Sequence, residues 1–331
     1  MSIKVENLTK YYGEQKAVDH ISFEIRTGEV IGFLGPNGAG KSTTMKMMTG
    51  YMAPTEGTVI IEGIDVSVDP LKIKKKIGYL PENNPLYTDM AIIDYLWFCA
   101  EIQGMDRDEI PGRIREMIDL CGLDAEKHKN INELSKGYRQ RVGLAQSIIH
   151  DPDVLIFDEP TTGLDPNQII EIRKLIKKLG EKKTVILSSH ILSEVEATCD
   201  RILIINRGQI VADGTADTLR KQAAGEEILK VQIETIAGES AETGLLSLPS
   251  VESIKKLEGK PNFFQVYSTP GNSSRRAVFD LCVKNHWYLM ELSVIETRLE
   301  DIFRNVTTRD PDYGDTHRDE GMEVNPKGQR V

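Results

Sequence analysis

Residues 154–160 read V-L-I-F-D-E-P, and this stretch decides the fold class of the chain. Four consecutive apolar residues between polar ones are typical of a strand that is buried on both faces of a parallel sheet. Two carboxylates, Asp158 and Glu159, follow the strand directly. Because open α/β sheets bind ligands beyond the carboxyl ends of their strands, we expect this acidic pair to lie at a ligand site. The alternative interpretation is a pair of residues that caps the next helix.

A glycine-rich stretch upstream reads G-P-N-G-A-G-K-S-T at residues 35–43, between a strand expected at 30–34 and a helix expected at 41–49. Glycines let backbone N–H groups curl around a phosphate, and the helix N-terminus adds partial positive charge. Lys41 is expected to reach the β- and γ-phosphates and Ser42 to ligate Mg²⁺. A simple glycine-rich turn is the alternative, which the flanking strand and helix disfavour. The expected nucleotide-binding residues are Gly35, Pro36, Asn37, Gly38, Ala39, Gly40, Lys41, Ser42 and Thr43.

Three residues outside this loop are expected to complete the chemistry. Asp158 is expected to hold the Mg²⁺ shell, and Glu159 to polarise the attacking water as a general base. His190 follows an apolar strand expected at 184–188. A lone histidine at a strand end is more often structural, but its place after the other motifs in order favours a hydrogen bond to the γ-phosphate. There it would hold the geometry of the water and Glu159.

A second phosphate-facing element reads L-S-K-G-Y-R-Q at residues 134–140, at the start of a helix expected over 134–150. Ser135 supplies a hydroxyl, Gly137 lets the backbone approach closely, and the helix dipole favours a phosphate. One triphosphate does not obviously need both phosphate-facing elements from the same molecule. The sequence therefore predicts a nucleotide shared between two subunits.

The composition is that of an ordinary globular protein, with 331 residues, 40% apolar and 28% charged. The formal charge of −10 argues against a general nucleic-acid binder, so no nucleic-acid partner is expected. Four scattered cysteines without C-x-x-C spacing indicate neither a metal site nor a disulfide framework, which favours a reducing cytoplasm. No segment resembles a signal peptide or is apolar enough to span a bilayer, so a membrane role would need a partner.

Strands alternate with helices over the first two thirds of the chain, which predicts a parallel sheet covered on both faces. We expect a nucleotide-binding domain at residues 1–222 with a helical subdomain at about 85–150. The stripe Ile93, Leu96, Trp97 and Ala100 in that subdomain is interpreted as core packing. Residues 225–307 are expected to form a small accessory α+β domain, with a last helix at 296–305. Residues 308–331 are rich in charges, Gly and Pro, and are expected to be a disordered tail.

Taken in order, the motifs resemble the ATP-binding subunit of ABC transporters over about residues 1–220. This resemblance implies a P-loop ABC ATPase domain, α/β with a mixed or parallel sheet core, a β-subdomain and a helical subdomain. It implies ATP and Mg²⁺ as ligands, and ATP hydrolysis coupled to transport. It also implies a head-to-tail homodimer with two ATP molecules at the interface. In that dimer residues 35–43, Asp158, Glu159 and His190 of one chain face Ser135 and Gly137 of the other.

The resemblance assigns two further residues. Tyr12 is similar to the family's adenine-stacking aromatic; Tyr11 could be meant instead, or neither tyrosine has a role. Asp165, in the stretch Gly163-Leu164-Asp165, is expected at the subunit seam, where it would couple the two sites. A helix cap before Pro166 is an equal and compatible interpretation of Asp165.

Two positions depart from the family's pattern. Glu82 stands where the family usually has Gln; it is expected to approach Mg²⁺ or the water, and a surface acid is the alternative. Lys136 replaces the second glycine of the signature, but it leaves Ser135 and Gly137 intact, so we do not interpret it as inactivating.

Three stretches resemble ATPases that partner ABC-2-type export permeases, most of all the gliding-motility-associated ATPases of Bacteroidetes-type bacteria. They are residues 77–87, residues 134–146 and L-E-D-I-F-R-N-V-T at 299–307. This implies a cytoplasmic motor subunit at the inner face of the membrane, bound to an integral permease. Because the helical region 85–122 lies between Glu82 and the signature, we expect the permease to dock there; purely internal packing of that face is the alternative. The alternatives are a non-transport ABC ATPase that acts on a soluble macromolecule, and a regulatory module without turnover.

Overall fold

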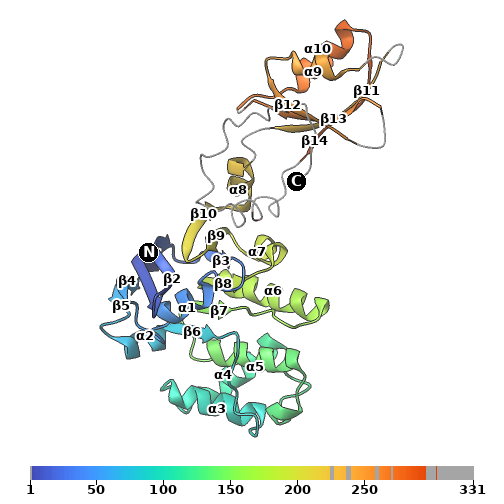
Figure 1. Cartoon of the computed structure of the whole chain (residues 1–331). Coiled ribbons are helices and arrows are strands. Elements are labelled where there is room, and N and C mark those ends of the chain that lie inside the picture. The colour runs from blue at the N-terminus through green and yellow to red at the C-terminus, as the bar shows by residue number, and fades with distance from the viewer. Residues whose placement is uncertain are drawn as a thin grey trace, which may run out of the picture.

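The computed structural model describes residues 2–223, 227–235, 240–257, 261–269, 271–295 and Phe303. These residues form a larger body with two sheets and a smaller unit with a third sheet (Figure 1). None of the described helices combines the length and the hydrophobicity needed to cross a bilayer.

The central sheet has six strands in the order β10-β9-β3-β8-β7-β6. All neighbours are parallel except the edge strand β10, which pairs antiparallel with β9. Every residue of β3, β7 and β8 is buried, so the apolar run 154–157 is confirmed as a strand inside a parallel sheet. The strands are β3 (Val30–Leu34), β6 (Ile77–Leu80), β7 (Val154–Asp158), β8 (Thr184–Ser189), β9 (Arg201–Asn206) and β10 (Gln209–Gly214).

An antiparallel sheet, β2-β1-β4-β5, packs on one side of the central sheet. Alternate residues of the central strands, such as Phe33 and Ile156, share one core with Leu8 and with the methionines of helix α1. Phe23 and Phe33 meet edge to face across this interface, 5.2 Å between ring centroids. The elements are β1 (Ile3–Tyr12), β2 (Gln15–Ile25), α1 (Lys41–Met48), β4 (Glu56–Ile61), β5 (Ile64–Asp65) and α2 (Pro70–Lys76).

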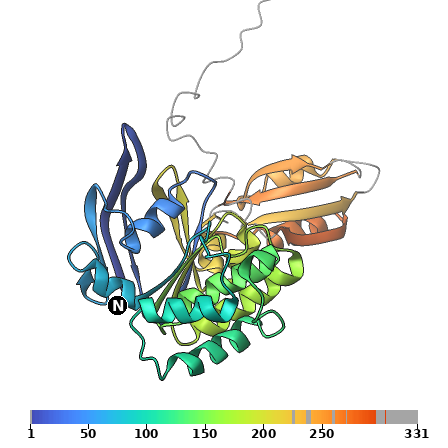
Figure 2. The ribbon, with the colours of Figure 1, turned by 90° about the horizontal axis from the view of Figure 1, so that it is seen from below.

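Helices cover the other face of the central sheet and extend into the helical region. Leu96 and Ala100 are fully buried there, while Ile93 and Trp97 are half-buried against the same core, so the interpretation of this stripe as packing is confirmed. The helices are α3 (Ile92–Ile102), α4 (Ile110–Cys121), the short 3₁₀ turn η1 (Ile131–Glu133), α5 (Lys136–Ile148), α6 (Pro166–Gly180), α7 (Leu192–Thr198) and α8 (Ala216–Ala223). Figure 2 shows helices from several parts of the chain gathered on this side.

The smaller unit runs β-α-β-β-α-β with an antiparallel sheet in the order β12-β13-β11-β14, which is the ferredoxin-like arrangement. Its described core holds only residues of the unit itself, among them Val231, Phe264 and Val278. Both views show it beside the larger body (Figures 1 and 2). The elements are β11 (Ile228–Glu234), α9 (Glu242–Leu246), β12 (Val251–Lys256), β13 (Phe263–Ser268), α10 (Arg275–Lys284) and β14 (Tyr288–Ile295).

The chain returns to the larger body after β14, because Phe303 packs, partly buried, against the core of the helical side of the larger body. The helix expected at 296–305 and the tail expected at 308–331 lie outside the described residues, apart from Phe303 itself. The division of the chain near residues 222–225 stays a prediction. Helices α2, α8 and α9 and strands β5 and β6 were not predicted from the sequence; all five are short.

Candidate functional site

The glycine-rich loop joins the end of β3 to the start of α1. Gly38 and Gly40 have φ angles of +80° and +109°, a region that favours glycine. A Cβ atom added to Gly40 would stand 2.6 Å from the carbonyl oxygen of Ala17, so this position has no room for a side chain. The first turn of α1 has N–H groups without partners inside the helix, and they are available to an anion.

A cavity of about 440 Å³ opens over this loop. Nine of the predicted site residues come together in it: six of the loop and, from outside the loop, Glu82, Glu159 and His190. The full lining is Ala17, Asn37, Gly38, Gly40, Lys41, Ser42, Thr43, Glu82, Glu159, Thr162 and His190.

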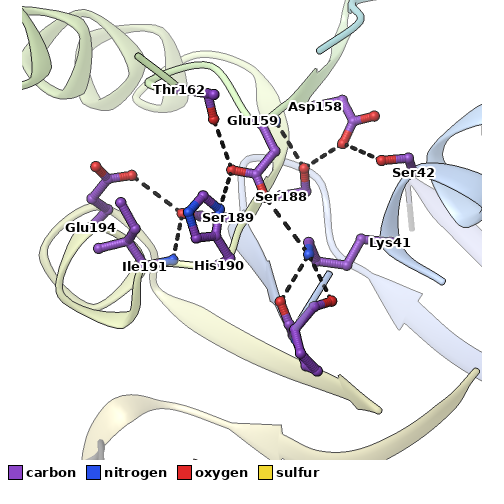
Figure 3. Close-up of polar contacts among 12 residues, drawn as sticks. Lys41, Ser42, Asp158, Glu159, Thr162, Ser188, Ser189, His190, Ile191 and Glu194 are labelled. Carbon is purple, nitrogen blue, oxygen red and sulfur yellow. Dashed lines mark hydrogen bonds and ion pairs between the residues drawn. The ribbon is translucent and has the colours of Figure 1, made fainter. Parts of the chain in front are cut away.

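Lys41 is 6% exposed and is held by the loop that it belongs to. Its Nζ donates to the carbonyl oxygens of Gly35 at 2.8 Å and Pro36 at 3.2 Å. The same atom lies 3.7 Å from Oε1 of Glu159. A cation is therefore fixed at the cavity wall, beside the carboxylate that follows β7 (Figure 3).

Asp158 is 1% exposed and accepts two hydroxyl hydrogen bonds through Oδ1. Ser42 Oγ donates to it at 3.1 Å and Ser188 Oγ at 2.6 Å. A serine hydroxyl beside a carboxylate is the oxygen donor set that suits Mg²⁺. Among the described residues no group of three or more His, Cys, Asp or Glu could hold a metal, so the ion would take further ligands from phosphate and water.

Glu159 has a φ angle of +51°, which is uncommon for a residue with a side chain and is found most often at functional sites. Its backbone N–H donates to Ser188 Oγ at 2.9 Å, and its Oε2 accepts from Thr162 Oγ1 at 3.2 Å. Nδ1 of His190 lies 2.9 Å from the same Oε2 (Figure 3). The predicted base and the predicted histidine are thus in direct contact, 31 positions apart in sequence.

Two residues that sequence reasoning missed support this arrangement. Ser188 bridges Asp158 and the backbone of Glu159; β7 and β8 pair with Asp158 opposite Ser188. Glu194, 7% exposed, accepts from Thr161 Oγ1 at 2.6 Å and from Ser189 Oγ at 3.2 Å. It therefore ties the loop after Glu159 to the turn that carries His190. The sequence signal that could have identified Ser188 is its place at the carboxyl end of the strand next to β7.

The signature residues lie elsewhere and do not line the cavity. Ser135 is exposed and caps α5, accepting from the N–H of Tyr138 at 3.4 Å. A Cβ atom on Gly137 would stand 2.5 Å from the side chain of Gln168, and Lys136 lies over Gly163. The start of α5 is therefore packed against the loop and helix start that follow Glu159.

Asp165 caps α6, as its alternative interpretation predicted. Its Oδ1 accepts from the N–H groups of Asn167 and Gln168, both at 3.0 Å. Tyr12 is 46% exposed, donates to the sulfur of Met52 at 3.1 Å, and does not line the cavity over the loop. Its stacking role and the role of Asp165 at a subunit seam stay predictions.

A groove of about 390 Å³ lies between the central sheet and the helical region. Exposed aromatic and aliphatic side chains line this groove, among them Tyr51, Tyr87 and Ile102. Burial lowers the pKa of His150, so this residue is neutral at pH 7 and Lys74 is the charged side chain of the lining. The lining is Thr49, Tyr51, Lys74, Ile77, Tyr79, Pro85, Tyr87, Tyr95, Phe98, Cys99, Ile102, Gln103, Gln146, Ser147 and His150.

Comparison with known proteins gives consistent matches. The family model described as ABC transporter matches residues 18–162. The ATP-binding protein MJ1023 of Methanocaldococcus jannaschii, described as an uncharacterised ABC transporter protein, is 42% identical over 69% of this chain and 82% of its own. The linearmycin resistance ATP-binding protein LnrL of Bacillus subtilis is 34% identical over 93% of this chain and 98% of its own.

A solved structure extends the comparison to a ligand-bound dimer. The ATP-binding cassette MJ0796, in a dimeric post-hydrolysis state bound to ADP and Pi, superposes with a TM-score of 0.60 at 27% identity. The match covers 64% of this chain and 98% of that cassette.

Proposed function

The chain belongs to the ABC transporter ATP-binding proteins, and from that premise we propose that two copies close head to tail around two ATP molecules to drive an ABC-2-type permease. The predicted P-loop ABC ATPase fold is confirmed, and the chain is an ATPase that binds ATP and ADP. Cassettes of this family dimerise and work with membrane permease components.

One observation carries the proposed dimer: the cavity over the phosphate loop is built without the signature. Lys41, Glu159 and His190 line that cavity, whereas Ser135 is exposed at the start of α5. In the proposed dimer, Ser135 of the partner subunit and the backbone at Gly137 of the partner subunit cover the γ-phosphate. The dipole of the partner's α5 then adds to the stabilisation of phosphate charge.

The residues of one half-site divide the chemistry among them. Lys41 exchanges its carbonyl partners for the β- and γ-phosphates, and Ser42 and Asp158 would hold Mg²⁺, with Glu82 expected to approach the ion or the attacking water. When bound, Mg²⁺ neutralises charge that develops on the phosphates. Glu159 orients and deprotonates the attacking water, and His190 holds Glu159 through the 2.9 Å contact and reaches the γ-phosphate.

A mixing experiment tests the shared site. Lys41→Ala and Ser135→Arg protomers are each expected to be inactive, because every homodimer then has two damaged sites. In a mixed dimer one site has both halves intact. An equal mixture should recover about a quarter of the wild-type phosphate release, since half of the dimers are mixed and each keeps one site.

The matched control mixes Lys41→Ala with Glu159→Gln. Both changes damage the same half of the site, so the mixed dimer has no intact site and no activity should return. Recovery in this control, or its absence with Ser135→Arg, would contradict the head-to-tail arrangement.

The groove of 390 Å³ supports docking of a permease segment at the helical region. Tyr87 is 58% exposed and packs edge to face on Phe98, 5.4 Å between ring centroids. Such exposed aromatic side chains are typical of interface anchors. With a permease bound there, the ATPase lies at the inner face of the membrane. The name of LnrL concerns antibiotic resistance, which favours export; a link to gliding motility stays a prediction.

Tyr87→Arg tests the docking step. The variant should keep the ATPase rate of the isolated protein but lose co-purification with the membrane permease and lose transport. Tyr288→Arg is the matched control, because Tyr288 is similarly exposed, at 68%, on β14 of the smaller unit. Unchanged transport by Tyr87→Arg would rule out this groove as the docking surface.

A further inference from the structure

Helix α2 presents an unusual outer face beside the groove. Its sequence is P-L-K-I-K-K-K, and Ile73 is its one fully buried side chain. Leu71 is 74% exposed, and Val68, just before the helix, is 79% exposed. Since residues three and four apart share a helix face, Leu71 lies beside Lys74 and Lys75, opposite Ile73. The outer face therefore combines aliphatic side chains with ammonium groups.

The charge of this face is not neutralised by the fold. Within the described residues, Lys76 pairs with Glu62 at 2.6 Å and Asp153 at 3.8 Å, but Lys72, Lys74 and Lys75 form no ion pair. Three free lysines stand close together in a chain of net charge −10. Such a local excess is complementary to an anionic surface.

The position of α2 puts this face at the rim of the groove. Lys74 and Tyr51 line the groove, and Tyr51 is 73% exposed. Nζ of Lys75 lies 4.0 Å from the place where a Cβ atom on Gly104 would stand, just beyond the end of α3. Lys74 thus lines the groove that we assign to the permease, and Lys75 lies close to the end of α3 beside it. Figure 1 shows α2 at the edge of the molecule, next to β4 and β5.

We propose that the outer face of α2 binds the anionic headgroups of the membrane in which the permease sits. Lys72, Lys74 and Lys75 contact lipid phosphates, and Val68 and Leu71 enter the boundary between headgroups and acyl chains. This inference rests on the proposed function, because this face lies beside the groove to which we assign the permease. Weak lipid contacts then orient the ATPase for docking. Of two anionic partners, a lipid surface fits this face better than an acidic peptide. A lipid surface contacts both the lysines and the exposed aliphatic side chains, whereas an acidic peptide contacts only the lysines.

Flotation of the purified full chain with lipid vesicles tests the contact without any permease. Binding should be measurable with vesicles of phosphatidylcholine plus phosphatidylglycerol, weak with phosphatidylcholine alone, and should fall as salt is raised. The triple variant Lys72→Gln, Lys74→Gln, Lys75→Gln should bind the anionic vesicles about a hundredfold less, at roughly fivefold for each lysine. Leu71→Ser should weaken binding at high salt, where the aliphatic contribution remains.

The matched control is Lys174→Gln, Lys177→Gln, Lys178→Gln on α6, which removes the same charge from three exposed lysines away from the groove. Equal loss in both triple variants, or vesicle binding that does not depend on anionic lipid, would overturn the proposal. All these variants should keep the ATPase rate of the isolated chain. The permease test with Tyr87→Arg is independent of vesicle binding. If Tyr87→Arg does not affect docking, the result of the flotation experiment is unchanged, and if the vesicles are not bound, the docking test is still valid.

Discussion

In the dimer that we propose, the phosphate-loop region and the signature region serve the same ligand, but they are built differently. Lys41, Asp158 and Glu159 are each less than 10% exposed and are held by several hydrogen bonds. Ser135 and Lys136 are exposed, and the hydroxyl of Ser135 has one long contact of 3.4 Å to the backbone. The first region is thus organised in the single chain, while the second keeps its groups in water. In the proposed dimer, most of the ordering needed for catalysis is therefore present in one half of the site before the partner's half closes on it.

The largest expected effect lies in the organised half. Glu159→Gln should lower phosphate release by roughly 10²–10⁴-fold, because a positioned general base is lost while the shape and the hydrogen bond from Thr162 remain. ATP affinity, measured with a fluorescent analogue, should stay near that of the wild type. A variant that loses affinity and turnover in equal measure would show that Glu159 serves binding instead.

The next effect tests the packing of the signature region. Gly137→Ala should lower turnover by about tenfold or more, because its methyl group meets the side chain of Gln168. Adding Gln168→Ala removes this clash and should restore much of the rate. If the double variant stays as slow as Gly137→Ala, the glycine is needed so that the backbone of α5 can approach the phosphate in the partner's site. The signature region would then act through its backbone and not through its packing on Gln168.

The smallest effect concerns the hydroxyl of Ser188, which bonds to both Asp158 and Glu159. Ser188→Ala leaves the N–H of Glu159 without its partner and should lower turnover by about fivefold, with little change in ATP affinity. Ser147→Ala is the matched control, because Ser147 is also buried but its hydroxyl donates to a carbonyl within α5. Equal loss of activity in both variants would indicate a general effect on stability.

The half of the site that follows contiguous motifs could be predicted from the sequence. Lys41 and Ser42 follow a glycine-rich loop after a buried strand, and Asp158 and Glu159 stand at the end of another. The supporting residues could not be predicted. Ser188 belongs to an apolar run, and its role depends on the register of β7 against β8. The contacts of Gly137 with Gln168 and of Lys136 with Gly163 join distant positions through tertiary packing.

The fold shows the same limit. Long apolar runs and helices with a clear stripe were predicted, including β3 with the bounds that the structure has. Helix α2 has a single buried residue in seven, so it carries no periodic apolar signal. Strand β6 is only four residues long and contains a glycine, which weakens a strand pattern.

Phe303 gives the smaller unit a second attachment. The polypeptide leaves the larger body after α8, forms the ferredoxin-like unit, and comes back to bury this aromatic ring in the core that it left. The smaller unit therefore lies between two parts of the chain that both contact the core of the larger body. Shortening the protein before residue 303 would uncover apolar surface on the ATPase itself, so a truncation meant to remove only the accessory unit would also damage the part that hydrolyses ATP.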